Sequence, residues 1–158
     1  MENLLELKKI TKCYLTIGNK GSRQLVKAVD DVDLEIKKDE VLGLVGESGC
    51  GKTTLGKLIM GLISTTGGDI IFGGKSLINS IDRKSKRELI RKMSAVFQDP
   101  YYSLNPRMSI FELVKEPLTV AIDRKRYNGD LLVKKVIDIL NNVGLSKEHL
   151  FRYSHEFS

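Results

Sequence analysis

The sequence predicts an α/β fold, and three observations favour this class. Residues 41–45 form an uninterrupted apolar run that is typical of a buried strand. A glycine-rich turn follows at 46–51, and apolar residues then recur at helical spacing over 55–63. On either side, residues 32–36 and 69–72 have the composition of further strands. A strand, a glycine turn and a helix in this order form the centre of the predicted fold.

The composition predicts one soluble, globular domain. The chain has 158 residues with 41% hydrophobic content, enough to bury one core. Cys13 and Cys50 are too few for a disulfide framework and favour a reducing compartment. No basic signal-peptide start and no apolar run of about 20 residues is present, so any membrane association is expected through a partner. The net charge of +6 suits polyanions, although a solvated surface is the first interpretation.

The turn at 46–54 fits the pattern G-x-x-x-x-G-K-[ST], which predicts a cradle for a polyphosphate. Glycines let the backbone approach phosphates with N–H groups pointing inward, and the helix presents its positive N-terminal end. Lys52 is expected to reach the β- and γ-phosphates, Thr53 to ligate Mg²⁺, and Thr54 to hydrogen-bond a phosphate oxygen. A flexible turn with a chance lysine is the alternative. The residues expected to contact nucleotide are Gly46, Glu47, Ser48, Gly49, Cys50, Gly51, Lys52, Thr53 and Thr54.

The elements before the phosphate loop are expected to form strands. Residues 4–7 begin a short strand, and a polar loop follows at 18–23. Apolar and acidic residues alternate over 31–36, which predicts a half-buried antiparallel strand. Residues 37–40 then turn the chain into the phosphate-loop strand.

The segment after the phosphate-loop helix is expected to add a strand and a basic helix. Residues 65–68 end the first helix, and 69–74 predict a strand with a tight turn. Residues 83–92 hold six basic side chains against Glu88 alone. A nucleic-acid patch is one interpretation, but no aromatic residues lie among the charges to stack bases. A solvated helix face is therefore favoured.

A short strand at 94–97 is expected to lead into an extended loop at 98–108. Pro100 and Pro106 disfavour helix at the residues before them, so this loop has a functional character.

Two helices are predicted in the last third of the chain. Ser109 and Glu112 fit a capping box that begins a helix, which Pro117 kinks or ends. A second helix follows Asp130, and Gly144 supplies its stop. Its expected core face consists of Leu132, Val133, Val136, Ile137, Leu140 and Val143.

Four segments in this order resemble the ATP-binding subunits of ABC transporters, and within them the oligopeptide and dipeptide importer branch. The first is Tyr14, and the second is the phosphate loop in the form Gly-Glu-Ser-Gly-Cys-Gly-Lys-Thr. The third is Gln98 within Phe-Gln-Asp-Pro-Tyr, followed by Ser-Leu-Asn-Pro-Arg-Met at 103–108, a loop that differs in other ABC branches. The fourth, Tyr-Ser-His-Glu-Phe-Ser at 153–158, is similar to the lead-in to the ABC signature.

The resemblance implies roles for two further residues and for partners. Tyr14 would stack on adenine, with a core tyrosine as the equal alternative. Gln98 would touch Mg²⁺ or the attacking water at the junction with the transmembrane subunit; the alternative is a glutamine that bonds loop backbone. ATP and Mg²⁺ are the implied cofactors. The implied partners are transmembrane permease subunits and a second ATP-binding subunit, the same or different, with no nucleic acid.

The resemblance covers the N-terminal half of an ABC-type P-loop ATPase domain. It implies an antiparallel β subdomain, the phosphate-loop strand and helix, most of the helical subdomain, and an incomplete core sheet. The expected division is a nucleotide-loading core over about 1–100 and the Q-loop with the helical subdomain over about 101–158, which stops inside the signature. Asp39 and Ser154 depart from the family's usual glycine and proline without touching nucleotide.

The resemblance implies that no catalytic residue lies in this chain, because the water-activating glutamate, the Mg²⁺-binding aspartate and the switch histidine are missing. Lys52 and Gln98 would support catalysis, and His155 precedes the signature and is no substitute for the switch histidine.

The expected function is that of an ATP-binding subunit, truncated in this form, that powers peptide import at the cytoplasmic face of the membrane. The alternatives are a nucleotide-binding fragment without hydrolysis, and an importer subunit for nickel or glutathione. A nucleic-acid-handling ABC ATPase is disfavoured by the loop after Gln98. A GTPase or small-molecule kinase is a further rival, and the missing Asn-Lys-x-Asp motif opposes GTP.

Overall fold

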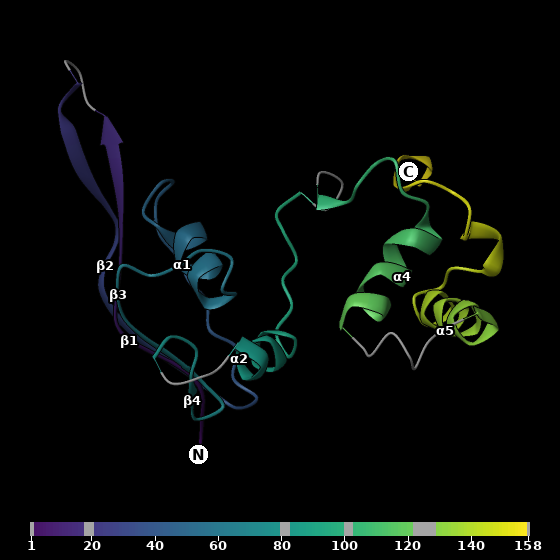
Figure 1. Cartoon of the computed structure of the whole chain (residues 1–158), viewed down its shortest axis with the longest axis horizontal. Helices are drawn as coiled ribbons and strands as arrows, with labels where there is room; N and C mark the ends of the chain where they lie inside the picture. Colours follow the sequence, from purple (N-terminus) through teal and green to yellow (C-terminus); the bar gives the residue numbers. More distant parts are fainter. Residues whose placement is uncertain (1, 18–20, 80–82, 100–102, 122–128, 158) are drawn as a thin grey trace. The chain divides into compact units, whose positions relative to one another are not determined.

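The computed structural model describes residues 2–17, 21–79, 83–99, 103–121 and 129–157. They form two compact units, Met1–Ala95 and Val96–Ser158, and each is described by itself (Figure 1). No helix in the described part of the chain is long and apolar enough to span a bilayer. The predicted mixed α/β class is confirmed, whereas the functional division near residue 100 stays a prediction.

The first unit is built on a sheet of order β2-β1-β3-β4. Its strands are β1 (Asn3–Ile17), β2 (Arg23–Lys37), β3 (Gly67–Phe72) and β4 (Lys75–Ser76), and each neighbouring pair is antiparallel. The expected antiparallel β subdomain is therefore confirmed. β1 is longer than the short strand predicted, because its second half pairs with β2 in a two-stranded ribbon.

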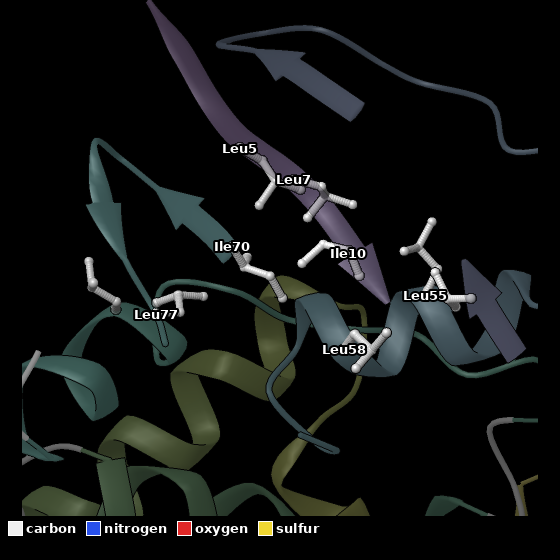
Figure 2. Close-up of a cluster of buried hydrophobic side chains, with 9 residues drawn as sticks. Leu5, Leu7, Ile10, Leu55, Leu58, Ile70 and Leu77 are labelled. Atoms are coloured by element: carbon white, nitrogen blue, oxygen red, sulfur yellow. The ribbon is translucent and has the colours of Figure 1, made fainter. Parts of the chain in front are cut away.

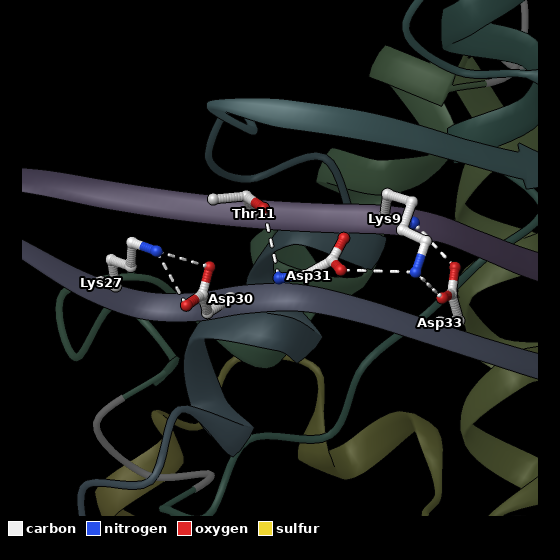
Figure 3. A network of polar contacts seen from close by, with 6 residues as sticks. All are labelled: Lys9, Thr11, Lys27, Asp30, Asp31 and Asp33. Carbon is white, nitrogen blue, oxygen red and sulfur yellow. Dashed lines mark hydrogen bonds and ion pairs between the residues drawn. The ribbon is translucent and has the colours of Figure 1, made fainter.

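Ion pairs hold an irregular stretch between β1 and β2 (Figure 3). Lys9 and Asp31 both have positive φ, where the register between the strands shifts. The Lys9 Nζ lies 2.8 Å from an Asp33 carboxylate oxygen and 3.3 Å from one of Asp31, and the Thr11 hydroxyl accepts the Asp31 N–H at 3.2 Å. These exposed pairs fix local geometry and contribute little stability. A Cβ at Gly68 would collide with the Lys9 carbonyl, so only glycine fits there.

Helix α1 (Lys52–Ile59) packs its apolar stripe on the sheet (Figure 2). Leu55 and Leu58 are both buried in this core. The other buried members of the cluster are Leu5, Leu7, Ile10, Val29, Ile70, Leu77 and Leu89.

Helix α1 ends at Ile59 and does not include Leu62 and Ile63, which the sequence placed in it. Gly61 ends the helix because its backbone turns left-handed, at a φ of 66°. The predicted basic helix is present as α2 (Arg83–Ile90), and Leu89 is its anchor in the core.

Two predicted strands are wrong in this structure. Residues 41–45 and 94–97 run without ladder pairing in the part of the chain that the structure describes. Val41 and Val45 are 97% and 94% exposed, although the apolar run predicted burial. A strand gains its stability from a neighbouring strand and a covered face, and the described sheet offers neither to these residues. This exposed run matches the expected incomplete core sheet.

The second unit consists of α4 (Ile110–Ala121), α5 (Gly129–Asn142) and the 3-10 turns η2 (Lys147–His149) and η3 (Ser154–Glu156). Its core cluster is Leu118, Leu132, Val136, Leu140 and Leu150. Val133 and Val143 are exposed, so that part of the predicted core face is wrong.

Pro117 lies inside α4 and does not end it. Gly144 does end α5, at φ 78, with the Leu145 N–H donating to the Leu140 carbonyl at 2.9 Å.

The predicted capping box at the start of α4 is confirmed. The Ser109 N–H donates to a Glu112 carboxylate oxygen at 2.9 Å, and the Glu112 N–H donates back to the Ser109 hydroxyl at 3.3 Å. These bonds satisfy donors that a helix start leaves without partners. The Ser109 backbone N–H also lowers the pKa of the Glu112 carboxyl below its ordinary value.

Candidate functional site

The predicted phosphate loop forms a turn that leads directly into α1. Gly49 and Gly51 have φ values of 83° and 98°, which an L-residue rarely adopts. Gly51 is the residue before Lys52, the first of the helix, and its carbonyl accepts the Leu55 N–H at 2.9 Å. The first N–H groups of a helix have no acceptor within it and carry partial positive charge. The loop therefore has the geometry of an anion site.

Gly51 approaches β2 so closely that a side chain is excluded. A Cβ at this position would collide with the carbonyl oxygen of Ala28 and contact Val29. Glycine thus serves two purposes here, since it permits the left-handed backbone and lets the loop rest on the strand. The contact places the phosphate loop beside the middle of β2.

We expect Gly51→Ala to lower the free energy of unfolding by about 2 kcal/mol or more, from backbone strain alone, and to abolish nucleotide binding. Gly56→Ala is the matched control, because Gly56 lies within α1 and a Cβ there meets nothing within 4 Å. Alanine in an open helical position should stabilise the helix by about 1 kcal/mol. Urea unfolding of both variants measures the difference. Equal stability of the two would show that the close approach of Gly51 is wrong.

The Lys52 side chain folds back over its own loop. Its Nζ donates to the carbonyl oxygens of Gly46 and Glu47, both at 2.6 Å, and lies 3.3 Å from the Cys50 Sγ. The ammonium group beside the sulfur lowers the pKa of the exposed Cys50 thiol. A Cβ at Gly46 would lie 2.7 Å from that sulfur, so the loop closes tightly around the lysine head.

An open hollow of about 430 Å³ adjoins this loop. Cys50, Gly51 and Lys52 of the phosphate loop line it, together with residues 27–30 of the adjacent β2. Its remaining lining is apolar and consists of Val32, Leu34, Leu44, Val45 and Leu55. The hollow combines a cationic end with an apolar surface, a combination that suits a ligand with a phosphate group and a flat ring. Sequence analysis missed the β2 wall, since no motif marks it.

Tyr14 lies on the surface of the ribbon. Its side chain is 40% exposed, so the alternative of a core tyrosine is wrong. Tyr14 pairs with Val26, two residues before the carbonyl of Ala28 that meets the phosphate loop. The Lys12 Nζ lies 5.1 Å from the centre of the ring, a cation–π contact. Stacking on adenine stays a prediction.

The donors expected for Mg²⁺ belong to different units. Thr53 is exposed in the first turn of α1, and Gln98 is exposed at the start of the second unit. Hydroxyl and amide oxygens are hard donors that suit Mg²⁺, so the chemistry of both side chains fits the ion. Thr54 is half-buried, while Glu47, Ser48 and Gly49 are exposed. The roles of these residues stay predictions.

The loop after Gln98 is described only in part, because Pro100, Tyr101 and Tyr102 lie outside the described residues. Residues 103–107 are exposed, and the N–H of the half-buried Met108 donates to the Asn105 carbonyl at 3.1 Å.

An apolar groove of about 450 Å³ adjoins this loop within the second unit. Sequence analysis missed the groove, although helical spacing of apolar residues in α4 and α5 could have indicated it. It is lined by Leu104, Ile110, Leu113, Val114, Pro117, Leu118, Ile139, Leu140, Val143 and Leu145.

Comparison with known sequences gives consistent matches. Residues 29–158 match the family described as ABC transporter. The oligopeptide transport ATP-binding protein OppF of Bacillus subtilis (strain 168) is 44% identical over 99% of this chain and 49% of its own length. OppF of Streptococcus mutans is 42% identical over 99% of this chain and 50% of its own length. The chain thus spans about half the length of the curated relatives it matches.

Solved structures match the fold. The ATP-binding cassette MJ0796, in a dimeric post-hydrolysis state bound to ADP and Pi, superposes with a TM-score of 0.75 at 26% identity, over 98% of this chain and 63% of that chain. CbiO1 from Clostridium perfringens, part of the transporter complex CbiONQ, gives a TM-score of 0.68 at 25% identity, over 100% of this chain and 57% of that one.

Proposed function

Because the chain belongs to the ABC transporter family, we propose that it is the nucleotide-binding part of an ATP-binding subunit that powers peptide import. The observation that carries this proposal is the phosphate loop, where Gly51 rests on β2 and Lys52 sits at the start of α1. The oligopeptide relatives supply the substrate class. Their names favour peptides over the alternatives of nickel and glutathione.

Nucleotide binding would use the loop and the hollow together. The triphosphate lies in the loop, where N–H groups of the α1 N-terminus and the Lys52 ammonium bind its oxygens. Lys52 must exchange its bonds to Gly46 and Glu47 for phosphate oxygens as nucleotide enters. The base lies towards the ribbon, where Tyr14 stacks on it. Thr53 would be a ligand for Mg²⁺, which would neutralise charge on the phosphates. The resemblance implies the same role for Gln98.

The stacking role of Tyr14 can be tested by removing the ring. Tyr14→Ala should weaken binding of a fluorescent ATP analogue about tenfold, since a base–aromatic stack contributes about 1–3 kcal/mol. Tyr14→Phe is the matched control, because it keeps the stacking face and loses only the hydroxyl. The same ring offers no hydrogen bonds to base edges, so competition by GTP should be only weakly poorer than by ATP. Equal affinity of Tyr14→Ala and the unmodified chain would refute the stacking role alone, and absence of any ATP binding would refute the proposed function.

The partners we propose are transmembrane permease subunits and a second ATP-binding subunit, with the chain peripheral at the cytoplasmic face of the membrane. The loop at 98–108 and the apolar groove beside it would dock on the permease. Leu104 lines that groove and is exposed, which an idle surface loop does not require.

A cysteine introduced at Ser103 should cross-link to a permease subunit in membranes that contain the assembled transporter. Ser103 is exposed and belongs to the proposed docking loop, where its hydroxyl donates to the Asp99 carbonyl at 2.9 Å. Cysteine at Lys147, exposed in η2 of the same unit, is the control position. Cross-links from position 103 only to another copy of the ATP-binding subunit would show that the coupling role is wrong.

A further inference from the structure

The far end of the β1–β2 ribbon exposes aliphatic side chains that nucleotide binding does not explain. Leu15 pairs with Leu25, and Ile17 pairs with Arg23. Since side chains alternate between the two sides of a strand, these four residues share one side, which we name the ribbon-tip face. Leu15, Ile17 and Leu25 are 63%, 81% and 70% exposed. The far ends of β1 and β2 extend beyond the other elements of the first unit (Figure 1).

The ribbon-tip face is distinct from the side that would meet nucleotide. Tyr14 precedes Leu15 and pairs with Val26, so its ring lies on the other side of the ribbon. Burying three large aliphatic side chains would be favourable, and the first unit leaves them in water. An external surface that covers them is therefore expected.

Basic and acidic residues are concentrated in different parts of the sequence that forms the ribbon. Residues 12–27 contain Lys12, Lys20, Arg23 and Lys27 and no acidic residue, whereas 30–40 contain six acidic residues and two lysines. Lys27 pairs with Asp30 at 2.9 Å, and the Lys12 Nζ donates to the Ser64 carbonyl at 2.6 Å. Arg23, beside Ile17, is the described cation at the aliphatic end, and Lys20 lies outside the described residues. The described end of the ribbon thus carries a cation, Arg23, beside its aliphatic side chains.

We propose that the ribbon-tip face lies against an anionic phospholipid bilayer, with its aliphatic side chains at the boundary between headgroups and acyl chains and Arg23 at the lipid phosphates. Apolar side chains beside cations are the pattern that binds a bilayer surface without spanning it. A bilayer supplies an apolar layer beneath a negative surface and needs no shaped pocket on the protein. This direct contact differs from the sequence-based expectation, in which membrane association occurs through a partner. It is independent of the proposed nucleotide function.

Vesicle binding by the whole chain tests the proposal. Vesicles of phosphatidylcholine with 30% phosphatidylglycerol should bind the chain in a sedimentation assay, and vesicles of phosphatidylcholine alone should bind it weakly. Arg23→Glu should lower the partition coefficient at least about tenfold, because it reverses one charge near the surface. Leu25→Asn should also lower it. The matched controls are Lys75→Glu and Leu62→Asn, which make the same changes at exposed positions of the first unit away from the tip.

A fluorescent reporter distinguishes insertion from adsorption. The chain has no tryptophan, so Ile17→Trp introduces a single probe at the tip, and Leu62→Trp is its control. Anionic vesicles should shift the emission of the tip probe to shorter wavelength, and brominated lipids should quench it. Three results would each overturn the proposal. The control variants could lose as much vesicle binding as the tip variants, the emission wavelength of the tip probe could stay unchanged, or the chain could bind vesicles only when permease protein is present. The last result would assign the face to a protein surface. ATP binding is measured separately and is not expected to change in these variants.

Discussion

Replacing Lys52 with alanine is expected to weaken ATP binding at least about tenfold, the largest effect of any single side chain in the phosphate loop. Its ammonium group is the one loop cation, and a charge-assisted contact to phosphate contributes about 1.5–3 kcal/mol. The loop itself would also change. The carbonyls of Gly46 and Glu47 lose the donor that holds them 2.6 Å away, so the empty loop relaxes.

Lys57→Ala is the matched control for this prediction. Lys57 is an exposed lysine in the last turn of the same helix, so the variant removes an equal charge away from the loop. Titration with a fluorescent ATP analogue gives the affinities. Alkylation of Cys50 in a Cys13→Ser background gives a second readout, since bound ATP should protect the sulfur that lies 3.3 Å from the Lys52 Nζ. Unchanged affinity in Lys52→Ala would show that the phosphate-loop assignment is wrong.

The phosphate loop could be predicted from sequence because its geometry is local. Glycines at fixed spacing permit the left-handed turn, and the apolar stripe with Leu55 and Leu58 determines which side of α1 is buried. The capping box of Ser109 and Glu112 and the stop at Gly144 could be predicted for the same reason. Each depends on residues within one helical turn of one another.

The strands could not be predicted to the same extent, because pairing depends on distant residues. The run at 41–45 has the composition of a buried strand and is exposed, since composition does not say which neighbour is present. β1 extends to Ile17 only because β2 pairs along its whole length. The early end of α1 at Ile59 had a local signal in Gly61, but the apolar residues at 62–63 opposed it.

In the candidate site, too, the features set by local sequence could be predicted and those set by distant contacts could not. The loop residues follow from the motif, whereas the wall formed by Ala28 and Val29 comes from a long-range contact with Gly51. The sequence predicted neither the strand that carries Tyr14 nor its exposed side, and both follow from the pairing with Val26. Gln98 belongs to the second unit, and its approach to the phosphate loop stays a prediction.

A polypeptide of residues 1–158 alone is expected to hydrolyse ATP no faster than background and to have low stability. By resemblance to the family, the glutamate that activates the attacking water is not among these residues, and neither Lys52 nor Gln98 can accept its proton. Binding would then occur without turnover. The exposed run at 41–45 lowers stability further, because Val41 and Val45 present an uncharged apolar segment without ladder pairing to solvent. Such a segment can pair with another chain and promote aggregation.

Phosphate release and thermal unfolding of the chain should be compared with those of full-length OppF from Bacillus subtilis, a relative of about twice the length. Val41→Lys and Val45→Lys should reduce aggregation of the short chain, because charge on an exposed edge opposes pairing between chains. Lysine at Ile17, also exposed and apolar, is the control for a general effect of charge on solubility. Steady hydrolysis by a monodisperse short chain that unfolds cooperatively would contradict the prediction, and would show that residues 1–158 contain a complete catalytic site.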